Sequence, residues 1–157
     1  MQRKPFTWEI KKLDRQTLVL FAGDLDERCS LEEFPSLSGE VTFDLAEVAR
    51  VTSGGVTRWI KLLSRLAEAE TTLSLVRCSV PVVTQLNMVR GFMGHGMVKS
   101  FYAPYVCEDS GEEEDVLLTP DQVPDTKNPP TFPSEDGQLV LNDLPRRYFA
   151  FLNYSRK

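Results

Sequence analysis

Cys107 and Ser110 stand at the spacing that cysteine pairs use to hold zinc. They lie in the run CEDSG, which matches one half of a Cys-x-x-Cys corner with serine in place of the second cysteine. A second run, FPSEDG, places Phe132 and Glu135 at the same spacing, with Gly137 in the turn. Two full corners would point four thiolates at one tetrahedral zinc ion. One thiolate and at most one carboxylate cannot hold structural zinc, so we expect no bound metal and no other cofactor.

The arrangement of the two corners resembles a zinc ribbon that has lost three of its four cysteines. The corners bracket a proline-rich loop, and each corner leads into an apolar run, DVLL at 115–118 or QLVL at 138–141. Without metal, such a lobe has to hold together by apolar contacts. The side chains available for these contacts are Val116, Leu117, Phe132, Leu139, Leu141, Tyr148, Phe149 and Phe151. The alternative is that the two runs are unrelated acidic turns.

Other polar residues offer weaker chemistry. His95 is the single histidine and lies between glycines, without the partners of a Ser-His-Asp set, so we interpret it as a loop residue at the surface. Asp24 and Asp26 follow a predicted strand and are expected to be solvated turn acids. Cys29 and Cys78 complete a set of three scattered cysteines, which is typical of reduced thiols.

The segment TSGGV, from Thr52 to Val56, precedes the clearest helix of the chain. Adjacent glycines allow close approach of the backbone, and the first amides of a helix carry a partial positive charge. Such an end can bind an anion, a phosphate or the carboxylate of a partner. The simplest alternative is structural, because Gly54 and Gly55 suit a strand-to-helix turn and Ser53 or Thr52 would cap the helix. Neither the Walker phosphate loop nor the dinucleotide glycine pattern is present.

Strands and helices alternate around this turn. Periodic apolar residues predict strands at 6–10, 17–23, 41–45, 72–78 and 98–106, a short helix at 30–34, and helices at 56–70 and 79–89. Trp59 shares the apolar stripe of the helix at 56–70 and is expected in the core. This alternation requires crossover connections. The expected fold class is therefore α/β, a small mixed sheet with helices packed on it, followed by a small C-terminal β lobe.

The order of these elements and the serine-bearing turn resemble the STAS domain, the family of bacterial anti-sigma-factor antagonists and related regulatory modules. The family carries Asp-Ser-Ser/Thr-Gly-Val/Leu at the place where this chain has Thr52, Ser53, Gly54, Gly55 and Val56. The resemblance covers roughly residues 5–107 and rests on this motif and the element order. It implies a non-enzymatic module that acts in signal transduction through protein–protein interaction.

The residues beside the matching serine depart from the family pattern. Ser53 corresponds to the serine that the antagonists' partner kinase phosphorylates. Thr52 replaces the aspartate before it, and Gly54 replaces the second hydroxyl residue. Ser53 and Thr52 are therefore the candidate phosphorylation positions. Because the usual neighbours are missing, we expect that this copy is not switched by phosphorylation.

Length and charge narrow the classes of function. A chain of 157 residues with 41% hydrophobic residues is sufficient for one domain and an appendage. Eighteen basic and 23 acidic residues give a net charge of −5, so the attraction that dominates nonspecific nucleic-acid binding is missing. No stretch approaches the length needed to cross a bilayer. We expect a cytoplasmic protein with no nucleic-acid partner and no membrane span.

We divide the chain into a STAS-like domain at 1–107 and a proline-containing loop with a β-hairpin extension at 108–157. The expected function is non-enzymatic regulation or scaffolding, with a protein partner bound through residues 52–56 and Arg58. The partner would be a kinase or anti-sigma-like protein or a multiprotein assembly, and exposed sheet edges leave self-association open. The alternative is a sensor that binds a small anionic ligand, a nucleotide or lipid headgroup, at the glycine-rich helix start. An enzyme is disfavoured because no acid, base and nucleophile converge.

Overall fold

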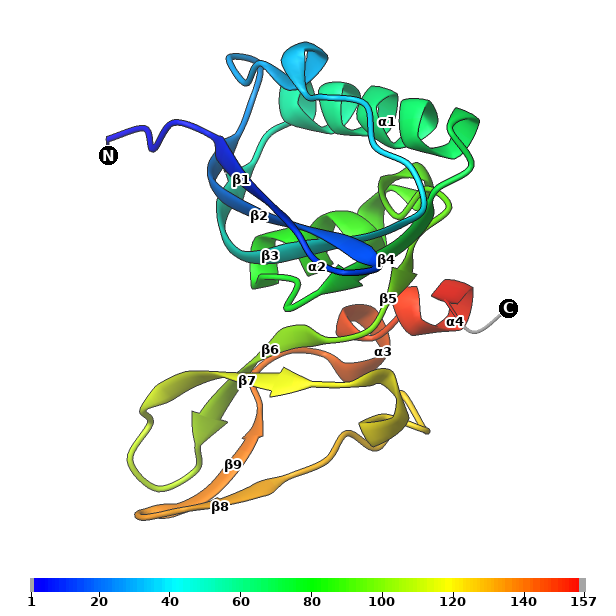
Figure 1. Ribbon diagram of the computed structural model, residues 1–157. Coiled ribbons are helices and arrows are strands. Elements are labelled where there is room, and N and C mark those ends of the chain that lie inside the picture. Colours follow the sequence, from blue (N-terminus) through cyan, green and yellow to red (C-terminus); the bar gives the residue numbers. More distant parts are fainter. Residues whose placement is uncertain (1, 156–157) are drawn as a thin grey trace.

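Two sheets, one in each of two stacked lobes, organise the chain. The computed structural model describes residues 2–155. The upper lobe contains a sheet of five strands with helices packed against it, and the lower lobe contains a second sheet of four strands (Figure 1). The expected α/β class with a small C-terminal β lobe is confirmed.

The first sheet has its strands in sequence order, β1-β2-β3-β4-β5. Their bounds are β1 (Thr7–Lys12), β2 (Gln16–Leu25), β3 (Glu40–Val51), β4 (Thr72–Val76) and β5 (Met97–Val98). The strands predicted at 6–10 and 17–23 are present as the antiparallel hairpin of β1 and β2. The other neighbours pair in parallel, which the crossover connections require.

The helices cover one face of this sheet. They are η1 (Leu31–Glu33), α1 (Ser53–Glu68), α2 (Val80–Met88) and η2 (Arg90–Phe92). Right-handed crossovers between strands that follow one another in order place their connections on the same face. Trp59 of α1 is 1% exposed and lies within 5.6 Å, between ring centroids, of Phe21, Phe43 and Phe92. Its core position, expected from the helical stripe, is confirmed.

Strand β3 is much longer than the five residues predicted. Its pairing with β2 shifts between Leu20 and Ala22 and again between Gly23 and Asp24. Each shift inserts an extra residue and breaks the period-2 alternation on which the prediction depended. The ten-residue strand β2 nevertheless keeps residues 46–51 extended by hydrogen bonding.

The second sheet has the order β7-β6-β9-β8. Its strands are β6 (Phe101–Cys107), β7 (Glu113–Leu118), β8 (Phe132–Ser134) and β9 (Gly137–Leu141), with a 3-10 turn η3 (Pro120–Gln122) after β7. The sequence division at residue 107 assigned β6 to the first domain, whereas β6 pairs in the second sheet. Of the predicted strand at 98–106, only Val98 belongs to the first sheet.

The C-terminal segment is helical and joins the lobes. Helices α3 (Pro145–Tyr148) and α4 (Phe151–Ser155) lie beside α2 and β6 (Figure 1). Asn87 of α2 donates from Nδ2 to the carbonyl of Tyr148 at 2.8 Å and accepts from the amide of Phe151 at 2.8 Å. Of the eight apolar side chains expected to pack in the lobe, Leu117 does not, because it is 44% exposed.

Candidate functional site

The turn before α1 is built by the ends of β2 and β3. The amide of Thr52 donates to the carbonyl oxygen of Leu25 at 3.0 Å, which fixes the chain where it leaves β3. The side-chain oxygen of Thr52 then accepts from the amide of Gly55 at 3.2 Å. Thr52 is therefore the N-cap of α1, and Ser53 is its first helical residue.

Gly55 is buried against the preceding strand and does not face outward. A Cβ at this position would lie 2.0 Å from the carbonyl oxygen of Leu25. The expectation that both glycines open the turn to an outside molecule is therefore wrong for Gly55, because the close approach is to β2 of the same chain. Gly54 is half-buried, and a Cβ there would lie 2.7 Å from Cβ of Glu27.

Glu27 places a carboxylate of the chain itself beside the start of α1. Its Oε2 atom accepts from the hydroxyl of Thr52 at 3.1 Å. Negative charge at this end of a helix is favourable because the first amides carry a partial positive charge. Glu27 thus lies in the region where an external anion was expected.

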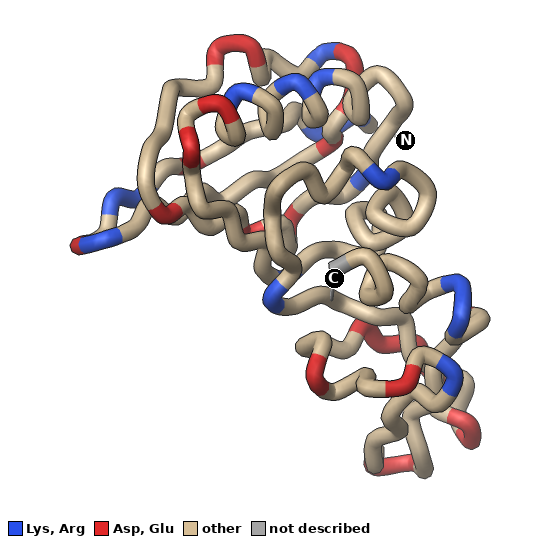
Figure 2. The backbone as a smooth tube through the Cα atoms, turned by 90° about the vertical axis from the view of Figure 1, so that its right-hand side faces the viewer, with Lys and Arg blue, Asp and Glu red and all other residues tan. Residues whose placement is uncertain are grey.

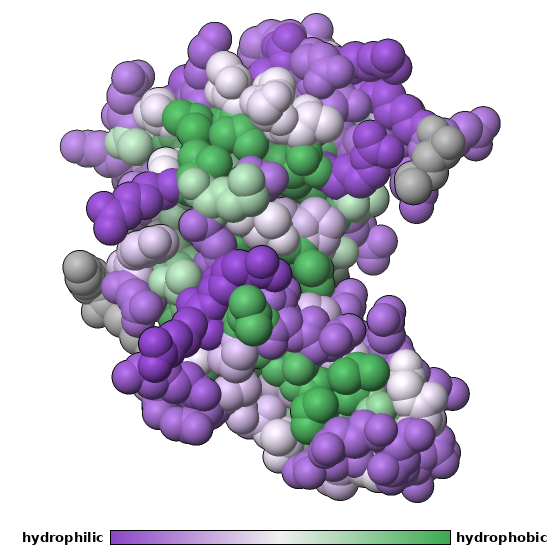
Figure 3. Space-filling model, turned by 180° about the vertical axis from the view of Figure 1, so that it is seen from behind, coloured by the Kyte–Doolittle hydropathy of each residue, from purple (hydrophilic) through white to green (hydrophobic). Residues whose placement is uncertain are grey.

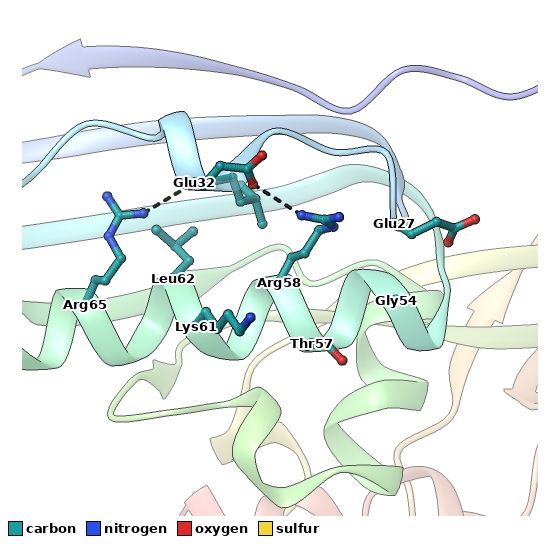
Figure 4. Close-up of a pocket in the computed structure, with 9 residues that line it drawn as sticks. Glu27, Glu32, Gly54, Thr57, Arg58, Lys61, Leu62 and Arg65 are labelled. Carbon is teal, nitrogen blue, oxygen red and sulfur yellow. Dashed lines mark hydrogen bonds and ion pairs between the residues drawn. The ribbon is translucent and has the colours of Figure 1, made fainter.

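A groove of about 510 Å³ runs along α1 from this turn. Figure 4 shows the side chains of α1 on one wall and the segment from Glu27 to η1 on the other. The lining residues are Glu27, Leu31, Glu32, Gly54, Thr57, Arg58, Lys61, Leu62 and Arg65. The candidate turn and the groove therefore form one continuous surface.

The charges in the groove are largely paired within the chain. Arg58 lies 3.3 Å from the carboxylate of Glu32, and both side chains remain partly exposed. Arg65 donates to the carbonyls of Leu31 at 3.1 Å and Phe34 at 2.7 Å, which ties the η1 segment to α1. Lys61 is exposed and makes no hydrogen bond or ion pair with the described residues. It is the cation of the groove that remains free for an external group.

The predicted surface residues divide into two groups. Ser53 is exposed, and its side-chain hydroxyl has no hydrogen-bond partner among residues 2–155, whereas its carbonyl accepts from Thr57 at 3.3 Å. The hydroxyl of Thr52 is engaged both as donor and as acceptor. Val56 is half-buried and packs against the hydrophobic core. Ser53 is therefore the accessible hydroxyl of the turn.

The two corners suspected of zinc binding do meet in space. They line a pocket of about 210 Å³ that includes Cys107, Ser110 and Glu135. Ser134, however, and not Phe132, lies opposite the thiol, with its oxygen 3.5 Å from Sγ of Cys107. Phe132 instead packs against the ring of Tyr105 at 5.5 Å.

Hydrogen bonding sets the chemistry of this thiol. The pKa of Cys107 is lowered because the hydroxyls of Ser110 and Ser134 and two backbone amides favour the thiolate. Within residues 2–155, no three side chains of His, Cys, Asp or Glu come together as a metal site. The pocket therefore presents one sulfur and two hydroxyls, with acidic residues such as Glu135 also in its lining.

Asp24 and Asp26 were expected to be solvated, and this is wrong. They are 1% and 7% exposed. Asp26 accepts from Nε and Nη2 of Arg3 at 2.7 and 3.0 Å, and this pairing lowers the pKa of the aspartate. Asp24 accepts from the amide of Lys4 at 3.1 Å. The N-terminal segment folds back over the end of β2 and removes both acids from water.

The remaining candidates show no nucleophile with a base. Thr71 donates its one hydroxyl proton to the carbonyl of Leu66 at 2.9 Å, so Nε2 of His95, at 2.9 Å, has to be the donor toward it. His95 itself is exposed, as expected. Cys29 and Cys78 are buried, and burial raises the pKa of both thiols.

Several residues of the groove were not found from the sequence. Glu27 and Glu32 contact the α1 region across 25 and 26 positions of the chain, so no local pattern indicated them. Lys61 and Arg65 were given no role from the sequence. Their spacing from Arg58 at i+3 and i+7, on one side of α1, was the only available signal.

Comparison of the chain with models of protein families, with curated proteins and with solved structures found no match. Among the described residues, no helix has the length and apolar character that crossing a bilayer requires.

Proposed function

We propose that this protein is a non-enzymatic regulatory or scaffolding protein whose upper lobe is a STAS-like module that binds a protein partner. The contact surface would be Ser53, Thr57 and the groove along α1. The serine-bearing turn and the alternation of strands and helices, on which the resemblance rests, support this proposal.

The observation that carries the proposal is the position of the Ser53 hydroxyl and the Lys61 ammonium. Both are exposed on the same helix, beside a groove of about 510 Å³, and neither has a partner among the described residues. Around them, Arg58 and Arg65 are held by contacts within the chain. A largely ordered surface with a few free polar groups suits recognition of a protein, because little ordering is required on binding.

A catalytic role is less well supported. His95 acts as a donor to Thr71, burial raises the pKa values of two thiols, and the hydrogen-bond partners of Cys107 are serine hydroxyls and backbone amides. Acid, base and nucleophile do not converge among these groups. The alternative of a sensor for a small anion is also weaker, because the Glu27 carboxylate lies beside the start of α1 and would repel it.

Replacement of Thr57 by arginine tests the protein-binding surface. Thr57 is exposed, lines the groove and donates from its hydroxyl to the carbonyl four residues earlier, at 3.3 Å. Thr84 of α2 is a matched control, since it is exposed and makes the same kind of bond at 3.1 Å. The experiment compares the proteins that co-purify from the native cell with wild type, Thr57→Arg and Thr84→Arg.

We expect a defined protein to be recovered with wild type and with Thr84→Arg, and to be lost with Thr57→Arg. Equal recovery with all three forms would contradict the proposed surface. A thermal shift assay with inorganic phosphate or ATP tests the alternative, because a ligand that binds only the folded state raises Tm. Gly55→Arg is unsuitable for this purpose, since its side chain would collide with β2.

A further inference from the structure

The negative charge of the chain is concentrated in its C-terminal part. Residues 1–100 contain 13 basic and 12 acidic residues, whereas residues 101–157 contain 5 basic and 11 acidic ones. Figure 2 shows the acidic residues spread along the lower lobe. The two ends of the molecule therefore differ in electrostatic character.

One face of the second sheet is apolar and partly uncovered. Residues that lie opposite each other in antiparallel strands share a face, so the register identifies its members. The apolar members of this open face include Tyr102, Pro104 and Val106 of β6, Leu117 of β7 and Val140 of β9. Four of these side chains are half-exposed, and Leu117 is 44% exposed. Figure 3 shows hydrophobic side chains gathered at the surface of the lower lobe.

Two acids of β7 lie on the open face. Glu113 is opposite Val106 and Asp115 is opposite Pro104, and both acids are exposed. Asp115 and Tyr102 also line a pocket of about 300 Å³ where the sheet meets the upper lobe. Glu114, between the two acids, is opposite Tyr105 and belongs to the other face. The open face is thus an apolar surface with acidic groups along β7, which is an edge strand.

The turn between β1 and β2 has the complementary character. It reads KKLDR, with Lys11, Lys12 and Arg15 exposed around Leu13, which is 49% exposed. A tight hydrogen bond of 2.8 Å from the amide of Leu13 to the carbonyl of Gln16 closes the turn. In Figure 2 this turn projects from the upper lobe, well separated from the lower lobe. It presents one apolar side chain among three basic groups and one acid, Asp14, so the turn carries a net positive charge.

We propose that the β1–β2 turn of one molecule docks on the open face of another, so that copies associate head to tail. Leu13 would cover part of the apolar surface, and Lys11 and Lys12 would lie near Glu113 and Asp115. Opposite charges on the two surfaces fix the register and favour this encounter.

A symmetric pairing of two open faces is disfavoured on the same grounds. It would bring Glu113 and Asp115 of both copies together, and like charges in an interface are unfavourable. The contact between turn and face joins two different patches, so each copy retains one free patch of each kind. Association is expected to continue beyond the dimer as concentration rises.

Charge-reversal substitutions on the two surfaces test this contact. The tip variant carries Lys11→Glu and Lys12→Glu, and the face variant carries Glu113→Lys and Asp115→Lys. Glu114→Lys is the matched control, because Glu114 lies on the same strand but on the other face. Sedimentation over a range of concentrations measures association, and circular dichroism verifies that each variant is folded.

Wild type and Glu114→Lys should associate with similar affinity. The tip and face variants should each associate at least about tenfold more weakly than wild type. A mixture of tip and face variants should recover association, because an acidic turn then meets a basic face. Raising the ionic strength from about 0.1 M to about 1 M should weaken wild-type association, since the screening length falls from about 10 Å to about 3 Å. A wild type that remains monomeric, or association equal in all variants, would overturn the proposal. A monomeric wild type whose open face binds a synthetic Lys/Leu peptide would also overturn the proposal, because the face would then bind another partner.

Discussion

The carbonyl oxygen of Leu25 lies where a Cβ of Gly55 would have to be placed, at 2.0 Å. Real side chains do not tolerate such an approach, and the oxygen belongs to backbone at the end of β2. The glycine at this position is therefore required for packing of α1 on the sheet.

Gly55→Ala should lower the free energy of unfolding by about 3 kcal/mol, because either α1 or β2 has to move. Gly54→Ala should cost less, since its Cβ would lie 2.7 Å from Cβ of Glu27, a milder clash than 2.0 Å, and alanine favours the helix by about 1 kcal/mol. Chemical denaturation of both variants measures the difference. Equal losses would show that the contact with Leu25 is not the cause.

Asn87→Ala should release the C-terminal helices from α2. Two buried backbone groups lose their partners, and an unsatisfied group costs about 1 to 3 kcal/mol, so a total loss of about 2 to 4 kcal/mol is expected. Limited proteolysis should then cleave first in the C-terminal segment that follows residue 143. Thr84→Ala, an exposed change on the same helix, should stay within about 0.5 kcal/mol of wild type. If cleavage begins elsewhere in the Asn87 variant, the proposed attachment is wrong.

Tyr105 should make the lower lobe sensitive to high pH. Its hydroxyl donates to the carbonyl of Pro130 at 2.8 Å, and burial raises its pKa from 10.0 to about 12. Between these two values the unfolded chain loses the proton and the folded chain retains it. Stability that is present below pH 10.0 should therefore be lost as pH rises toward about 12. Denaturation across this range should show a shallower decline for Tyr105→Phe than for wild type.

The Arg3–Asp26 ion pair should make the stability of the fold depend on pH in the acidic range. Arg3 lowers the pKa of Asp26 below its ordinary value of 3.8, so its stabilising contribution is present above that value and lost as pH falls further. Arg3→Gln should reduce the loss of stability in acid and release the N-terminal segment from β2. Thermal unfolding measured at neutral and acidic pH would detect both effects. An unchanged acid response in the variant would exclude the pair as its source.

The three thiols should differ in reactivity. The thiolate is the reactive form, and Cys107 has a lowered pKa beside a pocket of about 210 Å³. All three thiols are buried, but burial raises the pKa values of Cys29 and Cys78, whereas hydrogen bonds lower that of Cys107. Brief treatment of the folded protein with iodoacetamide, followed by peptide mass spectrometry, should find Cys107 modified first. Ser110→Ala should slow that reaction, because it removes the first hydrogen bond to the thiolate.

Much of the upper lobe could be predicted because its signals are local. The opening hairpin, α1, β4 and α2 each bury one side, and burial leaves a period of two or of about 3.6 in the residues. The prediction failed where β-bulges interrupt the period of two. The predicted strand therefore ended at Leu45, whereas β3 continues to Val51. Strand β6 looked like the next member of the first sheet, since no local pattern indicates which partner a strand will choose.

The C-terminal segment was misjudged for a related reason. Tyr148, Phe149 and Phe151 were recognised as apolar groups available for packing, but they were expected in a β lobe. They form short helices because α2 offers Asn87 as a partner for their backbone groups. That partner lies more than 60 positions earlier in the chain.

The sequence by itself determined where the serine turn, the amphipathic helix and the main strands lie, because each depends on neighbouring residues. Only the tertiary structure decided that Gly55 faces the protein interior, that Glu27 lies beside the helix start, and that Asp24 and Asp26 leave the solvent. These outcomes depend on contacts between residues 20 or more positions apart. The sheet and the packing set that spacing, and it leaves no periodic pattern in the sequence.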